Sequence, residues 1–129
     1  MNLNMDMRIL VVDDSSTMRR IIKNDLKELG FRNVITADDG RSAWEIIQRD
    51  SIDLILSDHK MPGMTGQELL IHVRKHPDYN CLPFIMITAE AFRENVLQAI
   101  KLGVSNYVVK PFSARQLHEK IVKVCGAVC

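Results

Sequence analysis

Five polar side chains follow the ends of short apolar runs in the chain. They are three carboxylates, a hydroxyl and an ammonium, which are groups that can bind metals or take part in catalysis. Asp13 and Asp14 follow the first such run, and Asp58 follows another near the middle of the chain. Thr88 and Lys110 end two later runs of the same kind. A carboxylate in such a position is a candidate metal ligand, base or nucleophile.

Three carboxylates in one cleft would repel one another and raise one another's pKa values. A hard divalent cation removes this conflict, and Mg²⁺ favours oxygen ligands, needs few carboxylates and keeps several waters. The hydroxyl of Thr88 and the ammonium of Lys110 suit an anion with several oxygens, such as a phosphoryl group. Acids, metal, hydroxyl and lysine together predict a site of phosphoryl transfer, where positioning and charge neutralisation dominate.

Each of these residues also has a simpler structural explanation. Asp58 could cap a turn, and Asp13 and Asp14 could merely favour the start of a helix. Lys110 could be a solvated loop lysine, and Thr88 a strand-end residue without a role. Their joint occurrence at successive strand ends favours the functional interpretation.

Continuous apolar, β-branched runs predict five short strands, and each is followed by a segment with helical spacing of its apolar residues. The expected strands are 9–12, 33–37, 54–57, 84–87 and 106–109. The expected helices are one that begins at Ser15 or Ser16 and stops at Gly30, and four that span 41–50, 65–76, 91–102 and 113–124. The inward face of the first helix is expected to hold Met18, Ile21, Ile22, Leu26 and Leu29.

Strands that alternate with helices predict an α/β fold, in which right-handed crossovers build a parallel sheet with helices on both faces. The carboxyl ends of parallel strands share one edge of the sheet, where ligands bind. The 129 residues suit one domain, with no repeat or linker, and residues 1–7 are expected to form a flexible start.

Composition narrows the function further. The net charge of +1 gives no electrostatic reason to expect binding to nucleic acid or an anionic membrane. The apolar runs are too short to span a bilayer, and the three cysteines form no C-x-x-C pair. We therefore expect a soluble cytoplasmic protein with incidental thiols. Neither G-x-G-x-x-G nor a Walker A motif occurs, so the site should bind a cation and not a dinucleotide or ATP.

Three histidines could also look functional. His72 and His76 have the i,i+4 spacing of a helical metal site, although exposed positions near a helix end are the favoured interpretation. His59 follows Asp58 directly and is expected to lie at the rim and contribute its backbone N–H.

These motifs, in their order along the chain, resemble those of the receiver domains of two-component response regulators. The motifs are the Asp13-Asp14 pair, Asp58 followed by Lys60-Met61-Pro62-Gly63-Met64, Thr88-Ala89, and Lys110-Pro111-Phe112. The resemblance covers about residues 8–125 and is greatest to the single-domain chemotaxis regulators of that family. It implies a flavodoxin-like fold, with a single five-stranded parallel sheet of strand order 2-1-3-4-5 flanked by five helices.

The resemblance also implies roles for the site residues. Asp58 would accept a phosphoryl group from a histidine kinase, with Thr88 and Lys110 as its partners in catalysis. Asp14 would ligate Mg²⁺ directly, Asp13 would act through water, and the backbone carbonyl of Lys60 would be a further ligand, with Mn²⁺ as a substitute metal.

The same resemblance implies an output surface. Tyr107 would move inward on activation, and the switch and output residues would include Ala91, Val109 and Lys120. A protein such as the flagellar motor switch would bind there, and a phosphatase is a further expected partner. The protein is expected to be a monomer that neither binds nucleic acid nor contacts a membrane.

Two other functions remain open at this point. One is a stand-alone receiver in a regulatory pathway other than chemotaxis. The other is an enzyme, a Mg²⁺-dependent phosphohydrolase with an aspartyl-phosphate intermediate. That class often has a D-x-D motif on its first strand and a cap domain; here the first acids are adjacent and no cap is present. A receiver without separate substrate turnover is therefore the preferred prediction.

Two positions depart from the chemotaxis regulators. Lys60 stands where those proteins carry Asn, and His59 where they carry Trp. Lys60 and Glu90 each follow a site residue by two positions, so they could pair across the mouth of the site and restrict water access to the aspartyl-phosphate. The alternative is that both side chains are solvated and have no kinetic effect.

Overall fold

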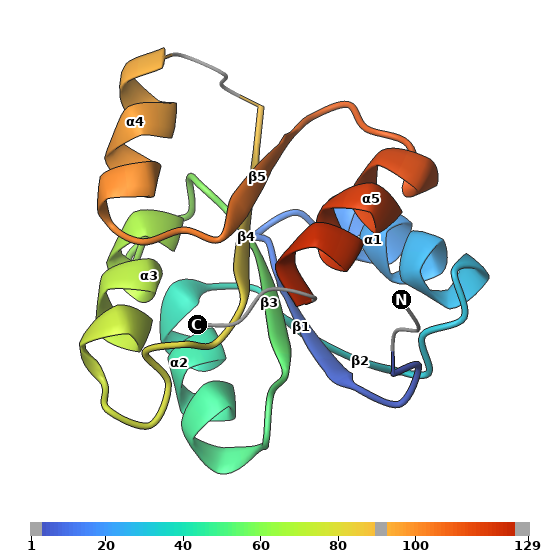
Figure 1. The fold of residues 1–129 in the computed structure, drawn as a ribbon, viewed down its shortest axis with the longest axis horizontal. Helices are drawn as coiled ribbons and strands as arrows, with labels where there is room; N and C mark the ends of the chain where they lie inside the picture. Colours follow the sequence, from blue (N-terminus) through green and yellow to red (C-terminus); the bar gives the residue numbers. More distant parts are fainter. Residues whose placement is uncertain (1–3, 90–92, 126–129) are drawn as a thin grey trace.

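The computed structural model describes residues 4–89 and 93–125, and its centre is one parallel sheet (Figure 1). The strand order is β2-β1-β3-β4-β5, which confirms the predicted topology. The strands are β1 (Arg8–Val12), β2 (Asn33–Ala37), β3 (Leu54–Asp58), β4 (Phe84–Thr88) and β5 (Asn106–Val109).

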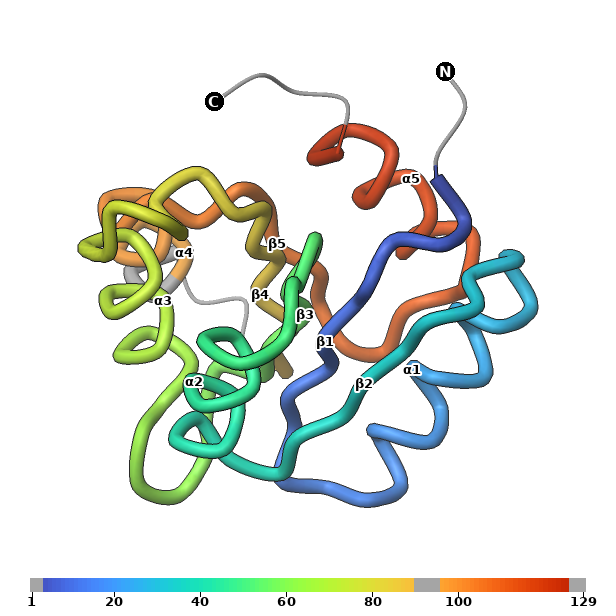
Figure 2. Tube along the Cα trace, turned by 90° about the horizontal axis from the view of Figure 1, so that it is seen from below, coloured from blue at the N-terminus to red at the C-terminus, as the bar shows by residue number. Residues whose placement is uncertain are grey.

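Five helices cover the two faces of the sheet. Figure 2 shows α1 and α5 on one side and α2, α3 and α4 on the other. The helices are α1 (Ser16–Glu28), α2 (Gly40–Arg49), α3 (Gly66–Lys75), α4 (Arg93–Lys101) and α5 (Ala114–Cys125). The structure thus has the α/β architecture with one sheet that the alternation of patterns predicts.

Strand β1, which lies between β2 and β3, shows why the apolar runs form strands buried on both faces. Side chains alternate across a strand, so Ile9 and Val11 pack into the core beneath α1 and α5. Leu10 and Val12 pack into the second core beneath α2 and α3. All four are at most 1% exposed, and each face of the sheet therefore has its own hydrophobic layer.

Side-chain caps define where three helices begin. Ser15 accepts a hydrogen bond from the N–H of Met18, Asp39 from that of Ser42, and Thr65 from that of Glu68. Such caps satisfy N–H groups that have no partner inside the helix. The predicted third helix, 65–76, is therefore one residue too long at each end, because Thr65 and His76 are its caps.

The prediction for the inward face of α1 is wrong at one position. Ile22 and Leu26 are buried, but Ile21 is 42% exposed. Ile21 lies about 100° around the helix from Ile22, so both cannot face the same layer.

Residues 4–7 pack against the domain. Met7 is buried in the core, and Met5 packs against that core. Asp6 accepts a hydrogen bond from Arg32 Nε at 2.7 Å and, through its backbone carbonyl, from Asn33 Nδ2 at 2.7 Å. These contacts join residues 5–7 to the domain, and the flexible start stays a prediction; residues 1–3 lie outside the described part.

The cysteines differ from the expectation of incidental thiols. Cys81 is disulfide-bonded. Cys125 is a free thiol, and burial, together with the nearby charge of Asp53, raises its pKa. Cys129 lies outside the described residues. Sequence spacing did not predict the bond at Cys81, because it does not report the distance between Cα atoms.

His72 and His76 belong to an aromatic cluster on α2 and α3. The ring of Trp44 lies 5.5 Å from that of His72, 5.9 Å from that of His76 and 5.9 Å from that of Tyr79, between centroids. His72 is exposed as expected, but the side chain of His76 is only 31% exposed. Within the described part of the chain, no group of three metal-ligating side chains includes either histidine.

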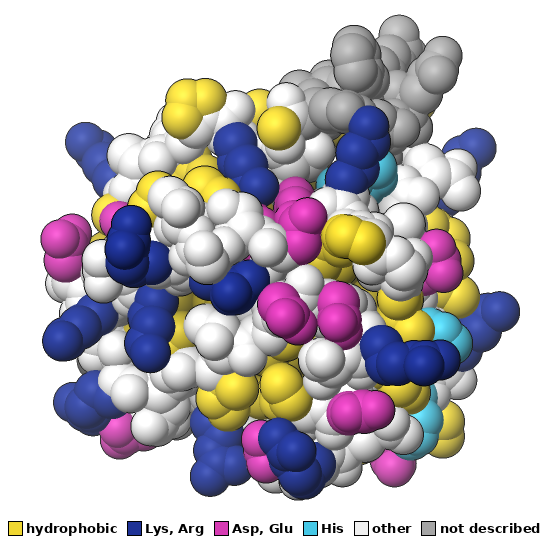
Figure 3. All heavy atoms as spheres, turned by 180° about the vertical axis from the view of Figure 1, so that it is seen from behind, with side chains coloured by type: hydrophobic (Ala, Val, Ile, Leu, Met, Phe, Trp, Pro, Cys, Tyr) yellow, Lys and Arg dark blue, Asp and Glu magenta, His cyan; other side chains and the backbone are white. Residues whose placement is uncertain are grey.

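Charged side chains of both signs share the face in Figure 3. Lys and Arg side chains lie around the rim and also within this face, and several acidic side chains lie near its middle. Among the described helices, none is long and apolar enough to cross a membrane.

Arg74 on α3 binds residues that precede β4 and β5. They lie at the amino-terminal edge of the sheet, opposite the edge that carries Asp13, Asp14 and Asp58. Its Nε donates to the carbonyl of Gly103 at 2.7 Å, its Nη1 to the carbonyl of Leu82 at 2.6 Å, and its Nη2 to the hydroxyl of Ser105 at 3.2 Å. Burial lowers the pKa of the Arg74 guanidinium. The same Ser105 hydroxyl accepts a hydrogen bond from the N–H of Phe84, so α3 is tied to the starts of β4 and β5.

Replacing Arg74 with methionine should destabilise the fold. Arg74→Met removes three hydrogen bonds from a charged donor, and we expect the free energy of unfolding to fall by about 2–4 kcal/mol in urea denaturation. Arg49→Met is the matched control, because that side chain is 70% exposed, and its effect should stay within about 0.5 kcal/mol. Equal losses in the two variants would contradict this role of Arg74.

Candidate functional site

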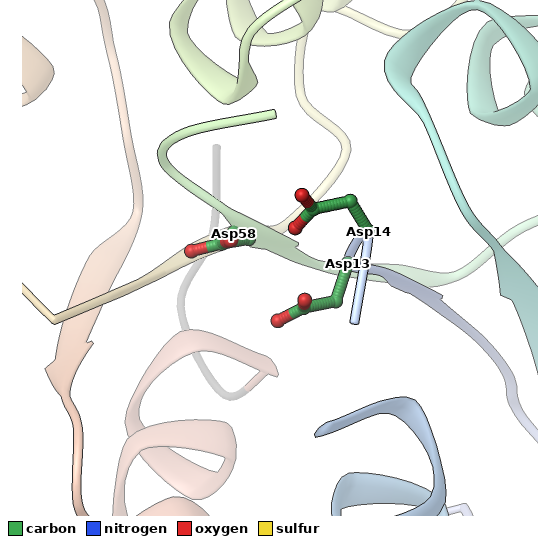
Figure 4. Close-up of side chains that lie close together, drawn as sticks. All are labelled: Asp13, Asp14 and Asp58. Carbon is green, nitrogen blue, oxygen red and sulfur yellow. The ribbon is translucent and has the colours of Figure 1, made fainter. Parts of the chain in front are cut away.

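Three carboxylates meet at the carboxyl edge of the sheet, as the sequence predicts. Asp13 and Asp14 follow β1, and Asp58 ends the neighbouring strand β3 (Figure 4). One oxygen from each lies within 4.8 Å of the others. Asp13 is 1% exposed, Asp14 is exposed and Asp58 is half-buried.

Lys110 joins two of these acids. Its Nζ lies 3.1 Å from Oδ2 of Asp13 and 3.3 Å from Oδ1 of Asp58. The lysine side chain is 18% exposed and those of the two acids 1% and 12%, so solvent screens these pairs far less than ordinary surface pairs. Lys110 is held from its backbone as well, because its N–H donates to the carbonyl of Thr88 at 2.8 Å.

The position of Thr88 agrees with its predicted place in the site. It is the last residue of β4, it is 6% exposed, and it pairs in register with Val109 on β5. A hydroxyl at this strand end therefore lies on the same edge as the lysine and the acids.

The loop after β1 is held by contacts that fix Asp13. The N–H of Ser15 donates to Oδ1 of Asp13 at 2.9 Å, and Nη1 of Arg19 donates to the backbone carbonyl of Asp13 at 2.7 Å. Arg19 is not among the residues that the sequence analysis singled out, because it lies outside the apolar face expected for this helix. A long side chain in the first turn of α1 can reach back to this loop, which periodicity alone does not reveal.

Burial dominates the electrostatics of Asp58. Desolvation raises the pKa of its carboxyl, and the neighbouring charge of Asp13 adds to the rise. The ammonium of Lys110, and the N–H of His59 that donates to Oδ1 at 2.9 Å, oppose it. The net direction is upward, so a bound cation or a phosphoryl group would relieve a carboxylate that its surroundings disfavour.

His59 contributes its backbone N–H, as predicted, but its ring is not simply a rim group. Both ring nitrogens are buried and have no hydrogen-bond partner among the described residues. The next residue, Lys60, is exposed and, with Asp14, Met61 and Pro62, lines an open hollow of about 380 Å³ beside the acids.

Three of the four predicted output residues, Tyr107, Val109 and Lys120, lie on β5 and α5. Tyr107 is half-buried, and Nζ of Lys120 stands 5.6 Å from the centroid of its ring. Nζ of Lys120 also donates to Oδ1 of Asn106 at 3.3 Å. A groove of about 290 Å³ is lined by Tyr107, Val108, Val109, Phe112, Gln116, Glu119 and Lys120.

Two residues of the sequence hypotheses cannot be placed. Glu90, the suggested partner of Lys60, and Ala91, one of the suggested output residues, lie outside the described residues. The gate formed by Lys60 and Glu90 therefore stays a prediction.

The acidic group fits a hard divalent cation. Its donors are carboxylate oxygens, the ligands that Mg²⁺ prefers, and their number leaves positions for water. Asp13 already has the N–H of Ser15 and the ammonium of Lys110 as partners, whereas Asp14 is exposed. A cation would thus bind mainly at the side of Asp14 and Asp58.

Comparison with known proteins agrees with this geometry. Residues 9–122 match the model of the response regulator receiver domain family. The chain is 48% identical to the chemotaxis protein CheY-3 of Vibrio cholerae over 122 residues, 95% of this chain and 94% of that protein. It is 51% identical to the chemotaxis protein CheY of Pseudomonas aeruginosa over 118 residues, which cover 92% and 95% of the two chains.

Solved structures give the same result. The chemotaxis protein CheY4 of Vibrio cholerae superposes with a TM-score of 0.86 at 34% identity, over 92% of this chain and 98% of that one. The receiver domain of a sensor histidine kinase from Pseudomonas aeruginosa has a TM-score of 0.86 at 27% identity, over 95% and 99% of the two chains. That structure holds a magnesium ion coordinated in its active-site cleft.

Replacing Asp58 with asparagine should stabilise the metal-free protein at neutral pH. The folded protein holds a proton on Asp58 more tightly than the unfolded chain does, since the pKa is raised. This group's contribution to stability therefore falls as the pH rises from the ordinary carboxyl pKa through the raised one. Asp58→Asn should raise Tm at pH 7, at about 3–5 °C per kcal/mol, and the difference from wild type should shrink towards pH 4.

The control for this measurement is Asp38→Asn, which changes an exposed carboxylate on the loop before α2 and should leave Tm nearly unchanged. Adding Mg²⁺ should raise Tm of the wild type more than that of Asp58→Asn. A metal-free Asp58→Asn variant less stable than wild type at pH 7 would contradict this account of the site.

Proposed function

Since this chain belongs to the response regulator receiver domain family and is of the CheY type, we propose that it is a phosphorylation-activated signalling switch in which Asp58 accepts a phosphoryl group from a histidine kinase. The observation that supports this proposal most directly is the pair of ionic contacts from Lys110 to Asp13 and Asp58, within a group of three carboxylates that fits Mg²⁺. This arrangement joins a nucleophile, a cation site and a positive charge at one strand edge.

The transfer itself is a displacement at phosphorus. A carboxylate oxygen of Asp58 forms the new O–P bond as the P–N bond of the phosphohistidine breaks. The electron pair of that bond stays on the ring nitrogen, and the ring, which carries a proton on its other nitrogen, leaves as neutral imidazole. Lys110 lies within 3.3 Å of the attacking carboxylate, so its ammonium can follow the charge that develops on the phosphoryl oxygens. Thr88, at the end of the adjacent strand, supplies a hydroxyl donor to the same group.

Mg²⁺, held by Asp14 and Asp58, with Asp13 through water and the carbonyl of Lys60 as a further ligand, would neutralise phosphoryl charge. The chain's own contribution is to hold the carboxylates together before the cation arrives. The N–H of Ser15 and the ammonium of Lys110 keep Asp13 in place, and the N–H of His59 orients Asp58.

Lys110 also links the site to the output surface. It directly follows β5, which carries Tyr107 and Val109 along the groove with α5. If the ammonium moves from the two acids to the phosphoryl group, the end of β5 must adjust, and the balance between two conformations of this surface shifts. A protein target of the chemotaxis pathway, such as the flagellar motor switch, would bind the activated surface.

The protein is proposed to act as a phosphoacceptor without turnover of a separate substrate. Its site is an edge lined by side chains at the ends of strands and directly after them, and the adjoining hollow is open to solvent. The names of its CheY relatives support chemotaxis as the pathway.

Asp58 should be the residue that is labelled. Incubation with acetyl phosphate and Mg²⁺ should add one phosphoryl mass to the wild type and none to Asp58→Asn, because asparagine has no carboxylate to attack phosphorus. Intact-protein mass spectrometry measures the difference, with Asp38→Asn as the variant that should be labelled normally. Labelling of Asp58→Asn equal to that of wild type would refute the assignment.

Removing Lys110 should weaken the conformational response more than the binding of metal. In Lys110→Ala, Mg²⁺ should still bind, while the backbone amide shifts of residues 104–120 on activation by beryllofluoride should be much smaller than in wild type. Lys123→Ala, which alters an exposed lysine on α5, should respond fully. A full response in Lys110→Ala would show that Lys110 does not couple the site to β5.

A further inference from the structure

The first turn of α3 passes so close to Asp58 that no side chain fits at Gly66. A Cβ on Gly66 would overlap the carbonyl oxygen of Asp58 and would lie 3.1 Å from its carbonyl carbon and 3.0 Å from Sδ of Met86. The overlap is with backbone, which cannot swing away as the end of a flexible side chain can. Gly66 does not have a positive φ, so glycine is needed here for proximity and not for conformational freedom.

Hydrogen bonds hold the same stretch of backbone from several sides. The N–H of Gly66 donates to the carbonyl of His59 at 3.0 Å, and the hydroxyl of Ser57 lies 3.0 Å from the carbonyl oxygen of Asp58. On the other side, the N–H of His59 donates to the carbonyl of Ile87 on β4 at 3.1 Å. The peptide that comes after Asp58 is therefore clamped between α3 and β4.

We propose that Gly66 is a positioning residue for phosphoryl acceptance, which lets α3 seat against the main chain of Asp58 and so sets where its carboxylate stands. The inference rests on the proposed function, since its consequence appears in cation binding and phosphoryl acceptance. The contact from Asp58 to Lys110 spans 3.3 Å, and a shift of about 1 Å would break it. Displacements of about 1 Å can cost about 100-fold in rate.

Gly40 offers a matched control within the same chain. It is the first residue of α2, as Gly66 is of α3, and each directly follows a capping residue. A Cβ on Gly40 would lie 2.6 Å from the carbonyl oxygen of Met64 and 2.8 Å from its Cβ. Gly40→Ala thus also forces a helix start away from a backbone, but at Met64 and not at Asp58.

The test compares Gly66→Ala with Gly40→Ala. We expect both to lower Tm, because both create an overlap with backbone. Gly66→Ala should accept the phosphoryl group from acetyl phosphate about 10–100-fold more slowly at saturating Mg²⁺ and should bind Mg²⁺ several-fold more weakly by calorimetry. Gly40→Ala should stay within about twofold of wild type in both. Equal losses in the two variants, or none in Gly66→Ala, would overturn the inference.

The outcomes separate this inference from the proposed function. A wild type that is labelled at Asp58, with an unaffected Gly66→Ala, keeps the function and removes the role of Gly66. An unlabelled wild type whose Mg²⁺ affinity falls only in Gly66→Ala keeps the positioning role and removes the function. If Gly66→Ala does not fold, the inference is tested by NMR on the wild-type protein. On addition of Mg²⁺, the amide resonance of Gly66 should shift more than that of Gly40. Equal shifts would overturn the inference.

Discussion

The site depends on one ammonium group enclosed by two carboxylates. Nζ of Lys110 lies 3.1 Å from Asp13 and 3.3 Å from Asp58, in surroundings that are largely shielded from water. A buried charge without partners is costly, and so is a pair of buried carboxylates without a cation. In the unphosphorylated protein, the pairing of Lys110 with the two carboxylates gives both the ammonium and the acids partners of opposite charge. Burial nevertheless keeps the pKa of Asp58 raised against the opposing effect of the ammonium, so the site is set to receive a further cation and an anion.

The fold serves this arrangement by bringing distant parts of the chain to one edge. Parallel strands β1, β3, β4 and β5 end side by side there, so residues separated by most of the sequence become neighbours. Two loops are then fixed by local contacts. Arg19 holds the carbonyl of Asp13, and α3 seats at Gly66 against the peptide after Asp58. Both contacts stabilise the positions of carboxylates, and neither touches a ligand.

Apolar runs predicted the strands and their parallel direction, and the residues directly after each run predicted which five polar side chains lie at the carboxyl edge, because both depend on local sequence. The strand order came from the resemblance to receiver domains. The features that sequence patterns missed depend on distances in the folded molecule. Nothing in a sequence reports that Arg19 turns back to a loop or that Gly66 meets Asp58. Ile21 fits a broad apolar stripe yet is exposed, since periodicity does not fix the edge of the buried face.

The most direct test of the account is chemical mapping of the phosphorylated residue. Borohydride reduces an acyl phosphate to an alcohol and so converts a phosphorylated aspartate into homoserine. Treatment of the protein after reaction with acetyl phosphate and Mg²⁺, and then peptide mass spectrometry, should find homoserine at position 58 alone, since Asp13 is enclosed by Lys110 and the N–H of Ser15. Homoserine at position 13 or 14, or none at position 58, would contradict the account.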